Sequence, residues 1–301
     1  MADEKLPDPR QQHEQPDTEG EQLPPPGSSG SVTPAMGDEP DHGEDSYRGS
    51  GRLADRVAIV TGGDSGIGRA VSLAFAREGA DVVLAYLPDE EDDGEATAKL
   101  VESSGRRALK VPGDLTSEDS CRELVDRTVS EFGRVDILVN NAAYQMAQPG
   151  GIADITTEQF DRVMKTNLYA MFWLCKMALP HMTSGSSIIN TTSVQSSSPS
   201  PELLDYATTK AGIVNFTRGL ATMVAADGIR VNAVAPGPIW TPLIPATMPE
   251  EKIESFGQQT PLGRVGQPAE LAPAYVFLAS AEASYITAEV IAVTGGMPVP
   301  V

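Results

Sequence analysis

Tyr206 and Lys210 stand four residues apart, a spacing that places two side chains on one face of a helix, one turn from each other. A free tyrosine titrates near ~10, so by itself it is a poor acid or base at neutral pH. An ammonium group beside the phenol favours the phenolate and lowers that pKa. The pair could therefore move a proton to or from a substrate hydroxyl, although Tyr-x-x-x-Lys alone also describes an ordinary surface tyrosine and lysine.

A glycine-rich turn far upstream gives this pair a context. Gly62, Gly66 and Gly68 follow the apolar run 57–60 and precede a segment over 69–78 with helical spacing of apolar residues. The missing side chains let the backbone turn tightly and let a pyrophosphate approach the N-terminus of the helix. A plain strand-to-helix turn is the alternative, but the strand–turn–helix placement favours a dinucleotide site.

Apolar runs and helix-like segments alternate along the rest of the chain. This alternation predicts an α/β fold, a Rossmann-type doubly wound seven-stranded parallel sheet with helices on both faces and no second domain. The strands are expected near 57–60, 81–86, 107–111, 135–139, 186–192, 229–234 and 289–293. The helices are expected near 69–78, 92–104, 117–132, 157–182, 202–226 and 268–280.

Residues 1–50 differ in composition and are rich in Pro, Gly, Ser, Gln and acidic side chains. Low hydrophobicity with high charge predicts a largely disordered extension. We expect residues 1–30 to be mobile and residues 31–52 to form an ordered arm on the domain or on a neighbouring subunit. Residues 53–301 are then the folded domain.

The charge and cysteine content restrict the partners and the compartment. A formal net charge of −20 argues against nucleic acid or an anionic membrane as a partner. No apolar run reaches the ~18 residues of a membrane helix, and the N-terminus lacks the features of a signal peptide. Cys121 and Cys175 lie in apolar-periodic segments without metal-like spacing, so we expect buried thiols, no metal site and a cytoplasmic location.

The two motifs together resemble the short-chain dehydrogenase/reductase family. Further pieces follow in the family's order: Asp114 after the third strand, Asn140-Asn141-Ala142-Ala143 after the fourth, Asn167, Ser193 and the loop Pro236-Gly237-Pro238-Ile239-Trp240-Thr241. With Tyr86-Leu87-Pro88 and the Pro-rich extension, they resemble a bacterial subgroup of stress-associated oxidoreductases and aldehyde reductases. The resemblance covers about residues 53–296. The sequence departs from the family's pattern at Ala143, which replaces a glycine and whose methyl group narrows the space beside the cofactor.

The resemblance implies an NAD(P)-dependent oxidoreductase that transfers hydride between a nicotinamide and a small carbonyl or alcohol. It would reduce aldehydes or ketones, or oxidise secondary alcohols. Tyr206 would be the general acid/base, and Lys210 would lower its pKa and hold the nicotinamide ribose. Ser193 would hold the substrate oxygen, and Asn167 would position a water that links Lys210 to solvent.

The same resemblance implies a set of cofactor contacts: Gly62, Asp64, Ser65, Gly66, Ile67, Gly68, Tyr86, Leu87, Asp114, Leu115, Asn141, Ala142, Ala143, Tyr206, Lys210, Pro236, Gly237, Ile239 and Thr241. Since Tyr86 and Leu87 are neither an acid for a ribose hydroxyl nor a base for a 2′-phosphate, NAD and NADP both remain open. We favour NAD because acids follow at 89–93 and no cation is evident. The substrate pocket is expected to include Ser193, Gln195, Tyr206 and Trp240.

Other classes of protein fit less well. A non-catalytic dinucleotide-binding sensor could have lost Tyr206 or Lys210, and both are present. Enoyl reductases space the tyrosine and lysine further apart. The family analogy further suggests a homotetramer paired through the helices near 157–182 and 202–226.

Overall fold

The computed structural model describes residues 8–13, 15–16, 30–31, 33, 36, 38–248, 250–253 and 255–299. The expected mobility of residues 1–30 falls largely outside this set. In the part of the chain that is described, no helix has the length and apolar character needed to cross a membrane.

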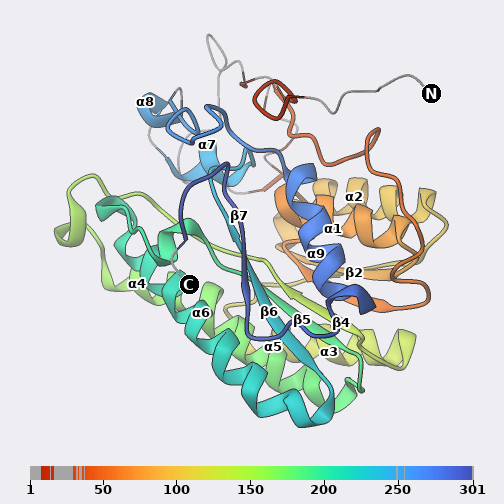
Figure 1. The fold of residues 1–301 in the computed structure, drawn as a ribbon. Coiled ribbons are helices and arrows are strands. Elements are labelled where there is room, and N and C mark those ends of the chain that lie inside the picture. The colour runs from red at the N-terminus through yellow and green to blue at the C-terminus, as the bar shows by residue number, and fades with distance from the viewer. Residues whose placement is uncertain are drawn as a thin grey trace, which may run out of the picture.

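The centre of the molecule is a seven-stranded parallel sheet with strand order β3-β2-β1-β4-β5-β6-β7 (Figure 1). This confirms the fold predicted from the alternation of elements. Every residue of the central strand β1 is buried, as a parallel strand covered on both faces requires. The strands are β1 Val57–Thr61, β2 Asp81–Tyr86, β3 Ala108–Pro112, β4 Ile137–Asn140, β5 Ser187–Thr191, β6 Arg230–Pro236 and β7 Val290–Val293.

Helices cover both faces of the sheet and divide the core into two clusters. Phe75 of α1 and Tyr275 of α9 belong to the cluster on one face, and Leu124 of α3, Leu174 of α5 and Ile213 of α6 to that on the other. The helices are α1 Gly66–Arg77, α2 Glu91–Ser103, α3 Glu118–Phe132, α4 Thr157–Met164, α5 Ala170–Ala178, α6 Leu204–Val224, α7 Leu243–Thr247, α8 Glu250–Ile253 and α9 Pro268–Ala279.

Two regions differ from the sequence-based expectation. The helix expected over 157–182 is broken at Lys165–Tyr169, where one π-helical turn separates α4 from α5. The segment after β6 contains two short helices, α7 and α8, that the pattern did not indicate. We call residues 240–265 the substrate lid, because α7 and α8 lie over one end of the cavity described below.

The strand order places a topological switch between β1 and β4. From β1 the chain proceeds outward to β2 and β3, and then returns to β4 on the other side of β1. In open parallel sheets, ligands bind at the carboxyl ends of the strands at such a point. The glycine-rich turn after β1 and the Asn140-Asn141 segment at the end of β4 therefore face the same crevice.

Candidate active site

The glycine-rich turn is built so that its backbone can approach a ligand closely. Gly62 and Gly66 have φ of +61° and +47°, a region that L side chains rarely adopt. A Cβ on Gly68 would lie 1.7 Å from the carbonyl oxygen of Gly62, so the first turn of α1 packs directly on the loop. Ser65, the N-cap of α1, makes no side-chain cap. The residues present thus suit a dinucleotide pyrophosphate at the N-terminus of α1.

The segment after β4 is tied to this turn by short hydrogen bonds. Thr61 Oγ1 accepts from the backbone amides of Asn141 and Ala142 at 2.9 and 3.0 Å. Asn141 Nδ2 donates to the carbonyl oxygen of Thr61 at 3.0 Å. The Asn-Asn-Ala-Ala motif therefore holds the glycine-rich turn and brings Ala142 and Ala143 to the wall of the cavity.

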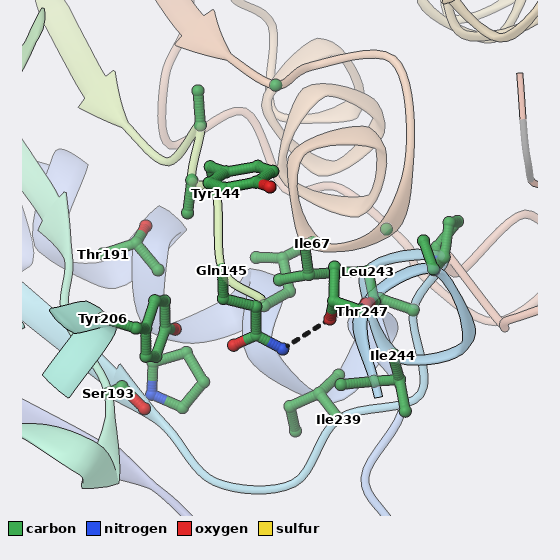
Figure 2. A pocket seen from close by; sticks show the side chains of 18 of the residues that line it. Ile67, Tyr144, Gln145, Thr191, Ser193, Tyr206, Ile239, Leu243, Ile244 and Thr247 are labelled. Atoms are coloured by element: carbon green, nitrogen blue, oxygen red, sulfur yellow. Dashed lines mark hydrogen bonds between the residues drawn. The ribbon is translucent and has the colours of Figure 1, made fainter. Parts of the chain in front are cut away.

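Tyr206, Lys210 and Ser193 come together as their spacing predicted. Tyr206 and Lys210 lie in the first half of α6, and Ser193 follows β5 and lines the same cavity. The Lys210 Nζ lies 5.2 Å from the centre of the Tyr206 ring and donates to the carbonyl oxygen of Thr191 at 2.8 Å. Figure 2 shows Ser193 and Tyr206 pointing into the same cavity.

The electrostatics of this group differ from the expectation that Lys210 lowers the pKa of Tyr206. Burial raises the pKa of Tyr206 to about 12, and the hydroxyl group of Ser193 opposes that rise. Burial also lowers the pKa of Lys210 to about 7. Both side chains are almost wholly buried, so desolvation of each charged form outweighs the attraction between them.

Asn167 occupies the π-helical turn between α4 and α5. Its Oδ1 accepts from the backbone amide of Tyr144 at 2.8 Å, and its Nδ2 donates to the carbonyl oxygen of Tyr144 and to Thr209 Oγ1, each at 3.0 Å. A π turn often marks a functional position, because it alters the direction of a side chain within a helix. Here it lets Asn167 hold the loop that begins at Tyr144.

A cavity of about 770 Å³ connects the glycine-rich turn with Tyr206 and continues beneath the substrate lid. Most of the predicted contacts line it: Gly62, Asp64, Ser65, Gly66, Ile67, Tyr86, Leu87, Asp114, Leu115, Asn141, Ala142, Ala143, Ser193, Gln195, Tyr206, Lys210, Pro236, Gly237, Ile239 and Thr241. Three predicted site residues lie outside the lining. Gly68 packs against Gly62, Asn167 lies behind Tyr144, and Trp240 is buried in an apolar cluster within the lid.

One end of the cavity is acidic. Asp64, Glu90 and Asp93 line it beside Leu87. Burial raises the pKa of Asp64 to about 6, and burial together with Asp64 raises that of Glu90 to about 8. Arg69, the nearby cation, is held by Asp93 Oδ1 at 2.6 Å and by the carbonyl oxygen of Asp64 at 2.8 Å.

The sequence did not single out several residues that complete the cavity. Gln145 Nε2 donates to Thr247 Oγ1 at 2.9 Å, and this bond crosses from the loop after β4 to α7 (Figure 2). Arg162 lies over the Tyr144 ring at 4.1 Å, and Lys252 of α8 pairs with Glu202. The contacts of Gln145 and Glu202 depend on the position of the lid, for which the sequence holds no periodic signal.

The chain is similar to a family model and to several known proteins. A family model described as enoyl-(acyl carrier protein) reductase matches residues 62–298. An uncharacterized oxidoreductase of Escherichia coli is 53% identical over 97% of this chain and 98% of its own. General stress protein 39 of Bacillus subtilis is 52% identical over 87% and 91% of the two chains. An NADPH-dependent chloroplastic aldehyde reductase of Arabidopsis thaliana is 48% identical over 87% and 92%.

A solved structure is also similar to this chain. A short-chain dehydrogenase from Burkholderia cenocepacia in complex with NADP has a TM-score of 0.76 and 31% identity, covering 81% of this chain and 98% of its own. The comparisons support a nicotinamide cofactor, but they do not support the expected preference for NAD. They also give no support to a non-catalytic sensor.

Proposed function

Since the chain belongs to the short-chain dehydrogenase/reductase family and is an NAD(P)-dependent oxidoreductase, we propose that Tyr206, Ser193 and Lys210 carry its reaction. The substrate class is a small aldehyde, ketone or secondary alcohol. The observation that carries the proposal is that Tyr206, Lys210 and Ser193 line one cavity together with the glycine-rich turn.

Each residue of this group has a separate task. When bound, the nicotinamide supplies or accepts the hydride. In the reductive direction, the Tyr206 hydroxyl donates its proton to the carbonyl oxygen, and the Ser193 hydroxyl donates a hydrogen bond to the same oxygen. Lys210, held by the Thr191 carbonyl, places a cation beside the phenolate that remains. Asn167 acts as a positioning residue, because its side chain holds the Tyr144 backbone.

The dinucleotide would lie along the wall formed by the glycine-rich turn and the loops after β2, β3, β4 and β6. The first-turn amides of α1 would receive the pyrophosphate. Asp114 and Leu115 would contact the adenine. Pro236, Gly237, Ile239 and Thr241 would cover the nicotinamide, as the resemblance implies.

We further propose that NADH binds more tightly than NADPH. A 2′-phosphate at the acidic end of the cavity would meet Asp64 and Glu90, while Arg69 is already paired with Asp93. Ionisation of Glu90 adds to this repulsion. The Kd for NADPH, divided by the Kd for NADH, should therefore rise as the pH passes the pKa of Glu90, about 8. Titration of both cofactors between about pH 7 and pH 9 tests this. Tighter binding of NADPH throughout would overturn the preference.

The experiment that tests the function is oxidation of NADH and NADPH by the purified protein over a panel of small aldehydes and ketones, with an enoyl thioester included. Tyr206→Phe removes only the hydroxyl that donates the proton. Tyr285→Phe, at a fully exposed tyrosine away from the cavity, is the matched control. We expect turnover with a carbonyl substrate, its loss in Tyr206→Phe and its retention in Tyr285→Phe. Normal turnover by Tyr206→Phe, or turnover of the enoyl thioester alone, would refute the assignment.

We also propose a cytoplasmic homotetramer that pairs through α4, α5 and α6. Exposed apolar side chains on these helices support this: Phe160, Tyr169, Phe172 and Met223. The free, buried thiols of Cys121 and Cys175 suit a reducing compartment. Light scattering on the purified protein checks the assembly, and a monomer would contradict it.

A further inference from the structure

The N-terminal extension is anchored on the end of α1. Arg77, at the end of α1, donates at 2.6–2.8 Å to the carbonyl oxygens of Gly43, Glu44 and Tyr47. The neighbouring Glu78 is fully buried and accepts from the Tyr47 hydroxyl at 2.7 Å. The chain around residues 43–52 is therefore fixed to α1, which belongs to the cofactor-binding layer.

The anchored segment leads directly to the beginning of α9. The carbonyl oxygen of Asp41 accepts from the amide of Ala269 at 2.9 Å, and the backbone amide of Asp41 donates to Gln267 Oε1 at 3.0 Å. Both partners lie just beyond the end of the substrate lid. The extension thus reaches the lid from a fixed point.

From this point, the extension packs against the outer side of the lid. Met36 is buried in an apolar cluster with four lid residues, Trp240, Ile244, Ile253 and Val265. The Trp240 indole N–H donates to the carbonyl oxygen of Asp38 at 2.8 Å. Trp240, expected in the substrate pocket, is instead buried in this cluster with Met36 and is absent from the lining of the cavity.

A second contact is made by Pro9 and Gln15. Gln15 Nε2 donates to the carbonyl oxygen of Phe256 at 2.8 Å, and Gln15 Oε1 accepts from the amide of Val265 at 3.2 Å. Arg264 Nε donates to the carbonyl oxygen of Pro9 at 2.8 Å. One glutamine side chain thereby joins two backbone positions of the lid. Figure 1 shows the red N-terminal residues beside the blue lid segment.

The inner side of the same lid closes on the cavity. The carbonyl oxygen of Thr247 accepts from the amide of Ala147 at 3.1 Å, in addition to the Gln145 bond. Lys252 pairs with Glu202 across the cavity mouth. The lid is therefore held between the pocket wall on one side and the extension on the other.

We propose that the N-terminal extension is a strap that holds the substrate lid closed, and that it sets the affinity of the enzyme for its carbonyl substrate. The proposal rests on the proposed function for the identity of that substrate. The lid contacts come from described residues at 9, 15, 36 and 38, and the anchor comes from residues 41–52. The extension is thus a positioning element that completes the substrate pocket without touching the reacting atoms.

Three variants weaken the strap while the anchor stays in place. Gln15→Ala removes two hydrogen bonds to the lid, and Met36→Ala leaves a gap in the apolar cluster around Trp240. Deletion of residues 1–37 removes the lid contacts of Pro9, Gln15 and Met36. Arg10→Ala is the matched control, because Arg10 lies in the same extension but pairs with Asp8. Cofactor binding should be retained in the three point variants, since the glycine-rich turn is untouched; the deletion also removes Gly30, which lines the cavity, and Ser31, which accepts from the Asp93 amide.

Hydrogen exchange followed by mass spectrometry reports on the lid without any need for turnover. We expect amides of residues 240–265 to exchange about tenfold faster in Gln15→Ala than in Arg10→Ala, with α1 unchanged. With the most active carbonyl of the panel, KM should rise about tenfold while kcat does not fall. If the extension only stabilised the fold, these variants would lower Tm and leave KM unchanged.

The outcomes separate this proposal from the proposed function. Faster lid exchange with a raised KM supports the strap. If no panel carbonyl is turned over by the wild-type protein, the proposed function fails, and the role of the strap in substrate affinity fails with it, whatever the exchange shows. If turnover is normal but lid exchange and KM of the deletion variant match those of Arg10→Ala, the strap is refuted while the proposed function stands.

Discussion

The Lys210 ammonium donates a 2.8 Å hydrogen bond to the backbone carbonyl oxygen of Thr191, the last residue of β5. The bond ties the first half of α6 to the carboxyl end of the sheet. It also gives the buried lysine a neutral acceptor in place of a carboxylate, so burial disfavours its charged form. The site therefore contains a lysine that can change its protonation state near neutral pH.

This lysine should leave a signature in the pH dependence of stability. Burial lowers the pKa of Lys210 from 10.5 to about 7 in the folded chain. Between these two values the unfolded chain binds a proton that the folded chain does not, so stability rises with pH across this range. Below about pH 7 both states are protonated and the full cost of burial is present.

Lys210→Met removes this titration. We expect the free energy of unfolding of the wild type, relative to Lys210→Met, to increase between about pH 7 and pH 10, as measured by urea unfolding. Lys99→Met, at an exposed lysine, should follow the wild type throughout. Parallel curves for the wild type and Lys210→Met would show that Lys210 has an ordinary pKa.

Ser193→Ala should affect chemistry more than binding. The Ser193 hydroxyl is the group besides Tyr206 that we place on the substrate oxygen, and it partly offsets the rise in the pKa of Tyr206. Loss of one such donor costs about 10²-fold in kcat. We expect that loss in steady-state turnover, with Kd for the dinucleotide unchanged. Ser197→Ala alters a serine of the same loop whose hydroxyl donates to the Val194 carbonyl oxygen, and it should keep full activity; an equal loss there would point to the loop, not to Ser193.

How much the sequence revealed depended on the range of the interaction. Gly62, Gly66 and Gly68 could be placed because one short motif holds strand, turn and helix together, and Tyr206 and Lys210 because helix geometry alone puts them on one face. The contact between Asp64 and Glu90 could not be predicted, since these two carboxyl groups come close only when α2 packs beside the glycine-rich turn. Trp240 was misplaced for the same reason, because its partner Met36 lies far away in the chain.

Gly68→Ala should disrupt the glycine-rich turn. The added methyl group would lie 1.7 Å from the carbonyl oxygen of Gly62, a backbone atom that cannot move without shifting the loop. We expect at least about a tenfold loss of dinucleotide affinity by calorimetry, or failure to fold. Gly219→Ala is the matched substitution, because its methyl group on α6 meets no atom within 4 Å and should stabilise the helix by about 0.5–1 kcal/mol. Unchanged dinucleotide binding by Gly68→Ala would contradict the packing described for the turn.

The buried carboxylate of Glu78 should make the anchor of the extension sensitive to acid. Burial alone would raise the pKa of Glu78, but hydrogen bonds from Arg52, Tyr47 and Ser50 outweigh it and hold the pKa at about 2. Because the folded pKa lies below the ordinary value of 4.5, the stabilisation is complete above about pH 4.5 and is lost as the pH falls towards 2.

Glu78→Gln keeps the shape of the side chain and removes its charge. We expect it to cost about 2–3 kcal/mol at neutral pH, because Arg52 and two backbone amides lose a charged acceptor. The deficit relative to the wild type should shrink as the pH falls below about 4.5, because the carboxyl group of the unfolded wild-type chain then binds a proton that folding must release. Glu102→Gln, on the exposed face of α2, serves as the control. If the deficit of Glu78→Gln stayed constant down to about pH 3, the anchor would depend on the shape of this side chain and not on its charge.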